Sequence, residues 1–214
     1  MDLNLHLLDE TLKERGRLAQ DVAHYLQVVN AECRRLSVIL DNFMKFARPT
    51  SMGLHEVDLR TVIAHIMALM HFEAQERKIQ LEERVEEALP PVFGDETQIS
   101  QVLVNILGNA FQAMPDGGRC SIATQVQQNA DARWVEVVVS DTGIGIKQED
   151  LSHLFEPFYT TKASGTGLGL AIAYRIMQDH GGTIRVSSVS GSGTTVVMQL
   201  PVAAGALEKL GVGS

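Results

Sequence analysis

The stretch "NILGNAFQAM", residues 105–114, places two asparagines four residues apart in an otherwise apolar run. In an α-helix Asn105 and Asn109 lie on one face, one turn apart. An amide that leaves water without finding a partner costs free energy. The pattern therefore raises the question of what these two side chains bind.

Composition sets the class of protein. The chain has 214 residues, 45% hydrophobic and 21% charged, which is typical of a globular protein, and its net charge of −8 excludes a basic nucleic-acid-binding surface. No apolar run approaches the roughly 20 residues of a membrane span, and the acidic start lacks the basic region of a signal peptide. Cys33 and Cys120 are predicted to be free thiols. We expect a soluble, cytoplasmic chain, or the soluble part of a longer protein.

The first 50 residues predict a helical hairpin. "KERG" at 13–16 is typical of a helix end, and Pro49 would stop the second, longer helix. That first helix is too short to cover the second one, so we expect either that another chain covers the seam or that residues precede Met1. The seam predicts a bundle between two chains, that is, a homodimer of the intact protein. The apolar seam of the second helix repeats in steps of three and four, as in a coiled coil: Ala19, Val22, Leu26, Val29, Cys33, Leu36, Leu40, Phe43 and Ala47.

Residues 51–214 alternate between helical and strand patterns. Segment 58–76 predicts a helix, 78–85 a strand, and Asp95 is the expected start of the helix that carries the two asparagines. The runs from 119 to 141 and from 183 to 201 each predict a β-hairpin, and 168–182 predicts a helix that ends at glycine. The pattern indicates an α+β sandwich with helices on one face of a mixed sheet.

Three glycine clusters stand out: "SDTGIGI" (140–146), "SGTGLGLAI" (164–172) and "GSGTTV" (191–196). A glycine-rich loop that leads into a helix lets backbone N–H groups face phosphate oxygens. Each cluster by itself is also compatible with a simple tight turn. None of them is a Walker loop or a dinucleotide-binding fingerprint.

In chain order, "NILGNAFQAM", "DTGIGI", "FEPFYTT", "GTGLGLAI" and "GSGTT" resemble the N, G1, F, G2 and G3 boxes of one ATP-binding superfamily. It holds gyrase, the Hsp90 chaperones, MutL and the sensor histidine kinases. The resemblance covers roughly residues 55–201. It implies a Bergerat-type sandwich that binds ATP between its helices and a mobile lid.

The resemblance also implies roles for the residues of the N and G1 boxes. Asp141 would accept a hydrogen bond from the adenine amino group, and Gly143 and Gly145 would let the chain curve around the base and ribose. Asn109 would coordinate a Mg²⁺ ion that bridges the phosphates, and Asn105 would lie by the metal or its waters. Mg²⁺ prefers oxygen ligands and keeps several waters.

The remaining boxes would complete the site. Lys162, in the lid, would contact the phosphates, and Thr195 would lie behind the adenine. The phosphates would also receive backbone N–H groups from the G2 box, contributed by Gly165, Thr166, Gly167, Leu168 and Gly169. The cofactors expected from the resemblance are ATP and Mg²⁺.

One position distinguishes branches of the superfamily. Gyrase and its hydrolytic relatives place a glutamate where this chain has Asn105, and an amide is a poor base for activating water. The chain therefore resembles the sensor histidine kinases, which hold ATP for transfer, with Asn105 and Lys162 as the expected catalytic residues.

The N-terminal segment resembles the same kinases. Residues 24–49, "HYLQVVNAECRRLSVILDNFMKFARP", resemble the second helix of their dimerisation and phosphotransfer domain. The resemblance implies a response regulator receiver domain as partner.

The phosphoacceptor box of that family is absent from the chain. Tyr25 follows His24 where the family has an acidic residue, and His6 has no acidic neighbour either. We therefore expect a catalytic region that cannot phosphorylate itself, with a partial hairpin at 1–50 and an ATP-binding domain at 51–214. Two alternatives remain open: an ATP-driven clamp or chaperone-type ATPase of the same superfamily, and a nucleotide-binding interaction module.

Overall fold

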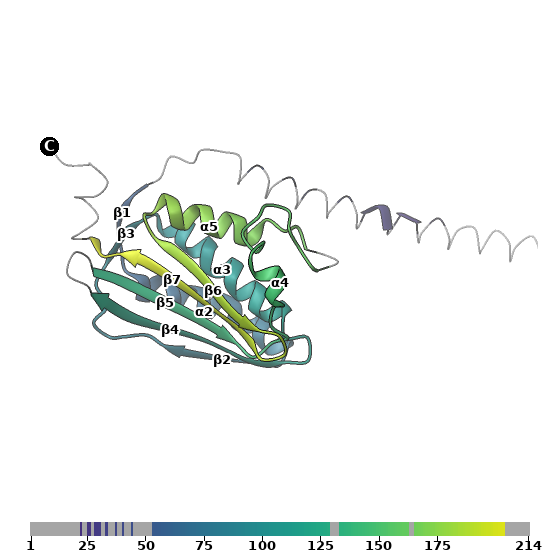
Figure 1. The fold of residues 1–214 in the computed structure, drawn as a ribbon, viewed down its shortest axis with the longest axis horizontal. Helices are drawn as coiled ribbons and strands as arrows, with labels where there is room; N and C mark the ends of the chain where they lie inside the picture. The colour runs from purple at the N-terminus through teal and green to yellow at the C-terminus, as the bar shows by residue number, and fades with distance from the viewer. Residues whose placement is uncertain are drawn as a thin grey trace, which may run out of the picture. The chain divides into compact units, whose positions relative to one another are not determined.

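A computed structural model describes residues 53–128, 133–162 and 165–203, together with single positions between 22 and 44. The chain divides into two units, Met1–Arg48 and Pro49–Ser214, and each is described by itself. Figure 1 shows the second unit as a sheet covered by helices.

In the first unit, each described position between 22 and 44 is α-helical with an exposed side chain. Five of the predicted seam residues are among them: Val22, Leu26, Val29, Cys33 and Leu40. His6, His24 and most of the predicted hairpin lie outside the described residues. The hairpin and its bundle therefore stay predictions.

The second unit is built on a five-stranded sheet with the order β2-β4-β5-β7-β6. Strand β2 pairs in parallel with β4, and the other pairs are antiparallel. Both predicted hairpins are confirmed, as β4–β5 and β6–β7. The strands are β2 (Ile79–Arg84), β4 (Gly118–Gln128), β5 (Arg133–Asp141), β6 (Thr183–Val189) and β7 (Gly193–Pro201).

Three helices lie together on one side of this sheet: α2 (Leu59–Glu76), α3 (Glu96–Gln112) and α5 (Gly169–Asp179) (Figure 1). The Asp95 carboxylate accepts from the Gln98 N–H group and caps α3, as the sequence predicted. A single turn, α4 (Gln148–Leu151), lies between β5 and α5. The predicted α+β class, with helices on one face of a mixed sheet, is confirmed.

A small second sheet was not predicted. Strands β1 (His55–Val57) and β3 (Val92–Gly94) pair antiparallel, with Val57 opposite Val92. Each strand has three residues, which is too short for an alternating pattern to show in the sequence. Strand β3 ends directly before Asp95, the N-cap of α3, so its pairing with β1 fixes the position of the start of that helix.

The core lies between the large sheet and the helices. Successive strand residues point to opposite faces, so the core side of β5 is formed by Val135, Val137 and Val139, each at most 2% exposed.

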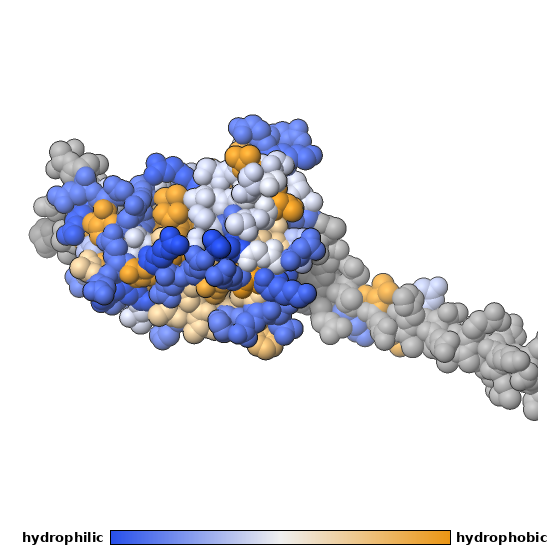
Figure 2. All heavy atoms as spheres, turned by 90° about the horizontal axis from the view of Figure 1, so that it is seen from below, coloured by the Kyte–Doolittle hydropathy of each residue, from blue (hydrophilic) through white to orange (hydrophobic). Residues whose placement is uncertain are grey.

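In Figure 2, a view of the molecule from below, hydrophobic residues lie in separate patches between hydrophilic ones. Among the described residues, no helix has the length and apolarity that crossing a membrane requires. Helix α3 contributes to the core Ile99, Val102, Leu103, Ile106, Leu107, Ala110 and Phe111.

A buried histidine joins the end of α5 to the start of α3. His180 is 1% exposed. Its Nε2 accepts from the Asp95 N–H group at 2.9 Å, so Nδ1 carries the proton and donates to the Ile176 carbonyl at 2.7 Å. A Cβ added to Gly94 would lie 2.8 Å from the His180 ring, which shows how closely β3 approaches it.

We expect His180→Ala to lower the free energy of unfolding by about 3 kcal/mol, because it opens a cavity and leaves a buried N–H group without an acceptor. Urea denaturation of the full chain, followed by circular dichroism, measures the loss. His65→Ala, at an exposed position on α2, is the matched control and should change stability by less than about 0.5 kcal/mol. Equal midpoints for the two variants would contradict this role for His180.

Candidate functional site

One edge of α3 is polar. Asn105, Asn109 and Gln112 follow one another at spacings of four and three, so they lie along one side of the helix, away from its fully buried residues. The Asn105 Nδ2 group donates to the Gly169 carbonyl at 3.1 Å. This bond ties the middle of α3 to the first residue of α5.

Lys162 reaches the same edge from the loop before α5. Its Nζ donates to Asn109 Oδ1 and to Gln112 Oε1, both at 2.9 Å. Burial lowers the pKa of Lys162, and the negative charge of Asp141 offsets this only in part. The structure therefore brings three of the predicted residues, Asn109, Lys162 and Asp141, into one neighbourhood.

Asp141 ends β5 beside this cluster. Its Oδ1 accepts from the Gly143 N–H group at 2.8 Å and from the Thr194 N–H group at 3.3 Å. Burial raises the pKa of Asp141, and the two backbone bonds and the charge of Lys162 lower it by less, so that the net shift is upward. Among the described residues, both of these N–H groups donate to Oδ1, so Oδ2 is left to accept a bond from a ligand.

The structure does not bring Thr195 to this site. Side chains alternate along β7, and Thr195 lies opposite Ser140 and exchanges a hydroxyl hydrogen bond with it at 2.9 Å. That pair is on the sheet face opposite to the core. Thr194 is the residue that faces the site, opposite Asp141 in the register. The two threonines are adjacent in the sequence, so the glycine cluster alone did not distinguish them.

The loop after Asp141 is held against the protein itself. The Ile144 N–H group donates to the Ala113 carbonyl at the end of α3, and the Gly191 N–H group donates to the Ile144 carbonyl. Gly145 has φ of 67°, and an added Cβ would lie 2.2 Å from the Val189 carbonyl oxygen. The close approach that requires glycine at 145 is thus to the β6–β7 turn.

The start of α5 carries no side-chain cap. Leu168 occupies the N-cap position and makes no side-chain hydrogen bond there, so the first N–H groups of α5 remain available to an anion. The preceding backbone is tightly packed: Gly167 has φ of 66°, and an added Cβ would lie 2.4 Å from the Phe158 carbonyl carbon. Residues 163 and 164 lie outside the described residues. Of the other predicted G2 residues, Gly165, Thr166 and Gly169 are half-buried.

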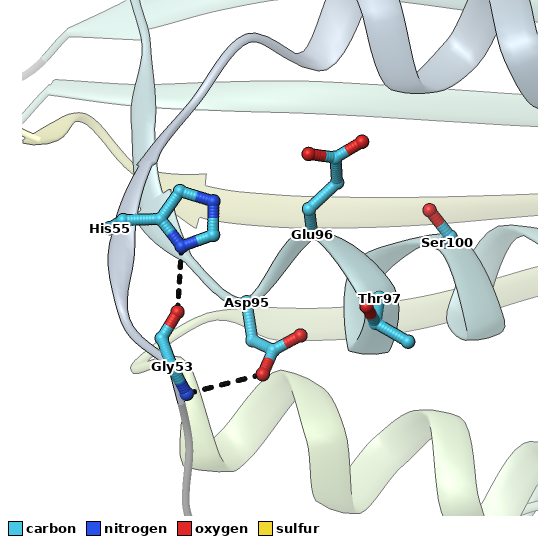
Figure 3. Close-up of a pocket in the computed structure, with 6 residues that line it drawn as sticks. All are labelled: Gly53, His55, Asp95, Glu96, Thr97 and Ser100. Carbon is cyan, nitrogen blue, oxygen red and sulfur yellow. Dashed lines mark hydrogen bonds between the residues drawn. The ribbon is translucent and has the colours of Figure 1, made fainter.

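A separate cavity of about 640 Å³ lies at the other end of α3 (Figure 3). Gly53, His55, Asp95, Glu96, Thr97 and Ser100 line it. Its distance from Asn109 is roughly 18 Å along the helix axis. The Asp95 carboxylate already accepts from the Gly53 and Gln98 N–H groups, and the cavity contains none of the predicted site residues. We therefore do not assign the function to it.

Cys120 is opposite Asp141 in the sheet, yet it is not a candidate nucleophile. Its side chain is 0% exposed. Burial, with a smaller contribution from the charge of Asp141, raises the pKa of its thiol to about 12. A thiol that stays protonated is a poor nucleophile.

Together, Asp141, Lys162, the α3 amides and the start of α5 could bind three kinds of ligand group. The Asp141 carboxylate accepts hydrogen bonds from amino groups, and the start of α5 and Lys162 attract anions. The amide oxygens on α3 suit a hard cation such as Mg²⁺. This donor set fits an amino-bearing polyanion bound together with a metal.

We expect Asp141→Asn to make the protein more stable without any ligand. The asparagine Oδ1 keeps the two backbone bonds, while the charge that burial disfavours is removed. Because the pKa of Asp141 is raised by folding, its ionised form destabilises the folded state at neutral pH. The gain should therefore be present at pH 7, shrink as the pH falls through the raised pKa, and be nearly gone at about pH 3, below the unfolded-state pKa of about 3.9, where the carboxyl is largely protonated in both states. Thermal unfolding at the two pH values measures it, and an equal gain at both would contradict the assigned cause.

The sequence comparisons point to kinases. The sensor histidine kinase ZraS of Escherichia coli K12 is 39% identical over 189 residues, which are 88% of this chain and 40% of ZraS. Sporulation kinase E of Bacillus subtilis 168 is 34% identical over 195 residues, which are 91% of this chain and 26% of that kinase. The chain thus spans less than half the length of either relative.

Solved structures agree with this. Full-length ShkA in complex with AMPPNP matches with a TM-score of 0.70 and 25% identity over 84% of this chain and 39% of ShkA. Histidine kinase ThkA in complex with the response regulator TrrA matches with a TM-score of 0.66 and 26% identity over 84% of this chain and 51% of ThkA.

The match to the family itself covers more than half of the chain. Residues 94–204 fit the description "Histidine kinase-, DNA gyrase B-, and HSP90-like ATPase". This range contains α3, Asp141, Lys162 and the start of α5. The predicted resemblance is confirmed: the chain belongs to the histidine kinase-, DNA gyrase B- and HSP90-like ATPase family.

Proposed function

We propose that this chain is the catalytic region of a sensor histidine kinase, which binds Mg-ATP and transfers its γ-phosphate to a histidine. One observation carries the proposal: the Asp141 carboxylate, the Lys162 ammonium, the α3 amides and the uncapped start of α5 converge on one site. The two kinase relatives and the AMPPNP complex of ShkA support it. From that histidine the phosphoryl group would pass to a response regulator.

Asp141 recognises the base in this proposal. Its Oδ1 is fixed by the Gly143 and Thr194 N–H groups, so the carboxylate is oriented before the ligand arrives. Its Oδ2 would then accept from the adenine amino group. Thr194, which lies opposite Asp141, would then be beside the base in place of the predicted Thr195. Gly143 and Gly145 shape the loop that borders it.

The phosphates would bind at the start of α5. The uncapped first turn of α5 and the Lys162 ammonium would attract negative charge there. Of the N–H groups from Gly165 to Gly169, that of Gly165 donates to the Lys162 carbonyl and that of Leu168 to Thr166 Oγ1 in the nucleotide-free protein, so these two would have to exchange their acceptors for phosphate oxygens. Mg²⁺ would bind to the Asn109 amide oxygen and, directly or through water, to Asn105, and when bound it would neutralise charge on the phosphates.

Asn105 favours transfer over hydrolysis. Its Nδ2 donates to the Gly169 carbonyl, which orients its Oδ1 as an acceptor but gives it no basicity with which to activate water. A clamp or chaperone-type ATPase would need a base near this position. The alternative of an ATP-driven clamp is therefore not favoured, and the kinase names of the relatives agree with this.

The partners also belong to the proposal. ThkA was solved as a complex with the response regulator TrrA, and we propose a receiver domain of that kind as the partner of the intact protein. We further propose that residues 1–50 form part of a dimerisation hairpin, that residues 51–214 form the catalytic domain, and that the chain acts in the cytoplasm.

Asn109→Ala should weaken Mg-ATP binding by about tenfold or more, because the proposed metal would lose a protein ligand. The far-UV circular dichroism should not change, since Asn109 is half-buried on the polar edge of α3. Titration calorimetry with the full chain measures the affinity. Gln178→Ala, on the exposed side of α5, is the control. Unchanged Mg-ATP affinity in Asn109→Ala would refute the metal assignment.

The reaction itself is tested by incubating the chain with γ-labelled Mg-ATP and treating the product with acid and with alkali. We expect nucleotide binding without sustained turnover and without label, because the phosphoacceptor box is absent from the sequence. Sustained release of labelled phosphate would favour the clamp-type ATPase. Label that is lost in acid and survives alkali would show that a histidine in this chain accepts phosphate, and His24→Gln would then identify it.

A further inference from the structure

Gln112 is the last residue of α3 and was not among the predicted site residues. Its Oε1 accepts from Lys162 Nζ at 2.9 Å, the same distance as the bond from Lys162 to Asn109. The two amides are three residues apart on one helix, so together they form a two-point holder for one ammonium group.

The second amide that binds Lys162 belongs to Asn109, which is also the proposed metal ligand. In the described structure the Lys162 ammonium is bonded to Asn109 Oδ1, the oxygen on which the Mg²⁺ site of the proposed function depends. A lysine ammonium and a magnesium ion bound to one oxygen would lie within a few ångströms of each other and repel. The hydrogen bond from Lys162 Nζ to Asn109 Oδ1 therefore competes with Mg²⁺ binding at the same oxygen.

We propose that Gln112 is a positioning residue, which holds the Lys162 ammonium on Asn109 in the nucleotide-free protein, and that Lys162 must leave this holder before Mg-ATP can bind. The inference rests on the proposed function. On binding, Lys162 exchanges two amide acceptors for phosphate oxygens, and Asn109 exchanges the ammonium for the metal. The apparent affinity for Mg-ATP is then reduced by the fraction of molecules in which Lys162 is held.

The two hydrogen bonds to Lys162 are modest in strength because Gln112 is exposed and Lys162, although its ammonium is partly desolvated, keeps much of its side chain in water. Hydrogen bonds between exposed side chains contribute little free energy. We therefore expect Gln112→Leu to tighten Mg-AMPPNP binding by about threefold, which corresponds to a small loss of holding free energy. Loss of an ordinary structural contact would leave the affinity unchanged or weaken it.

A double-mutant cycle separates the loss of the Gln112–Lys162 hydrogen bond from other effects of Gln112→Leu. Lys162→Met removes the ammonium, so in that background Gln112→Leu should no longer change the affinity for Mg-AMPPNP. Gln178→Leu, an exposed glutamine-to-leucine change on α5, is the matched control and should bind as the wild type does. Titration calorimetry with the full chain measures all five proteins. An equal effect of Gln112→Leu with and without Lys162 would overturn the proposal.

The holder can also be measured without any nucleotide. Acetylation with acetic anhydride, followed by mass spectrometry, reports how accessible each lysine amine is. Lys147, whose side chain is 70% exposed, is an internal reference in the same molecule. We expect Lys162 to react several times faster in Gln112→Leu than in the wild type, with the rate of Lys147 unchanged.

The two measurements also separate the inference from the proposed function. An unchanged Lys162 rate in Gln112→Leu would overturn the holder, even where the wild type binds Mg-AMPPNP and the proposed function stands. Failure of the wild type to bind Mg-AMPPNP would overturn both.

Discussion

The site depends on the two-sided character of α3. One side of the helix is apolar and fully buried against the sheet, with Leu103 and Phe111 at 0% exposure. This burial fixes the rotation of the helix about its axis, because turning it would bring apolar surface into water. The opposite edge must then present Asn105, Asn109 and Gln112 to the start of α5 and to Lys162. The positions of the three amides therefore follow from the packing of the apolar side of the helix.

The charges of the site oppose the stability of the fold. Burial raises the pKa of Asp141 and lowers the pKa of Lys162, so both side chains are held in surroundings that disfavour their charged forms. Each charge relieves the other in part. A ligand with an amino group and phosphates would complete what the protein leaves incomplete. Under the proposed function, this would be the physical reason for keeping an ionisable pair where a neutral pair would make a more stable protein.

The site is assembled from segments far apart in the chain, and the ties between them are few and specific. His180 joins the end of α5 to the N-terminus of α3, and Asn105 joins the middle of α3 to the start of α5. The two helices are thus held at two levels. A buried histidine and a half-buried amide thus fix the position of α5 against α3.

The sequence by itself determined the class of fold, because glycines, caps and apolar periodicity are local signals, and it carried the five boxes whose family resemblance implied the candidate site residues. Asp141, Asn109 and Lys162 were predicted from it and lie together. It did not distinguish Thr194 from Thr195, since which of two adjacent residues faces inward depends on the register with β5. It also missed Gln112 and the short β1–β3 pair. Only tertiary structure decided these, because each depends on a partner that is distant in the sequence.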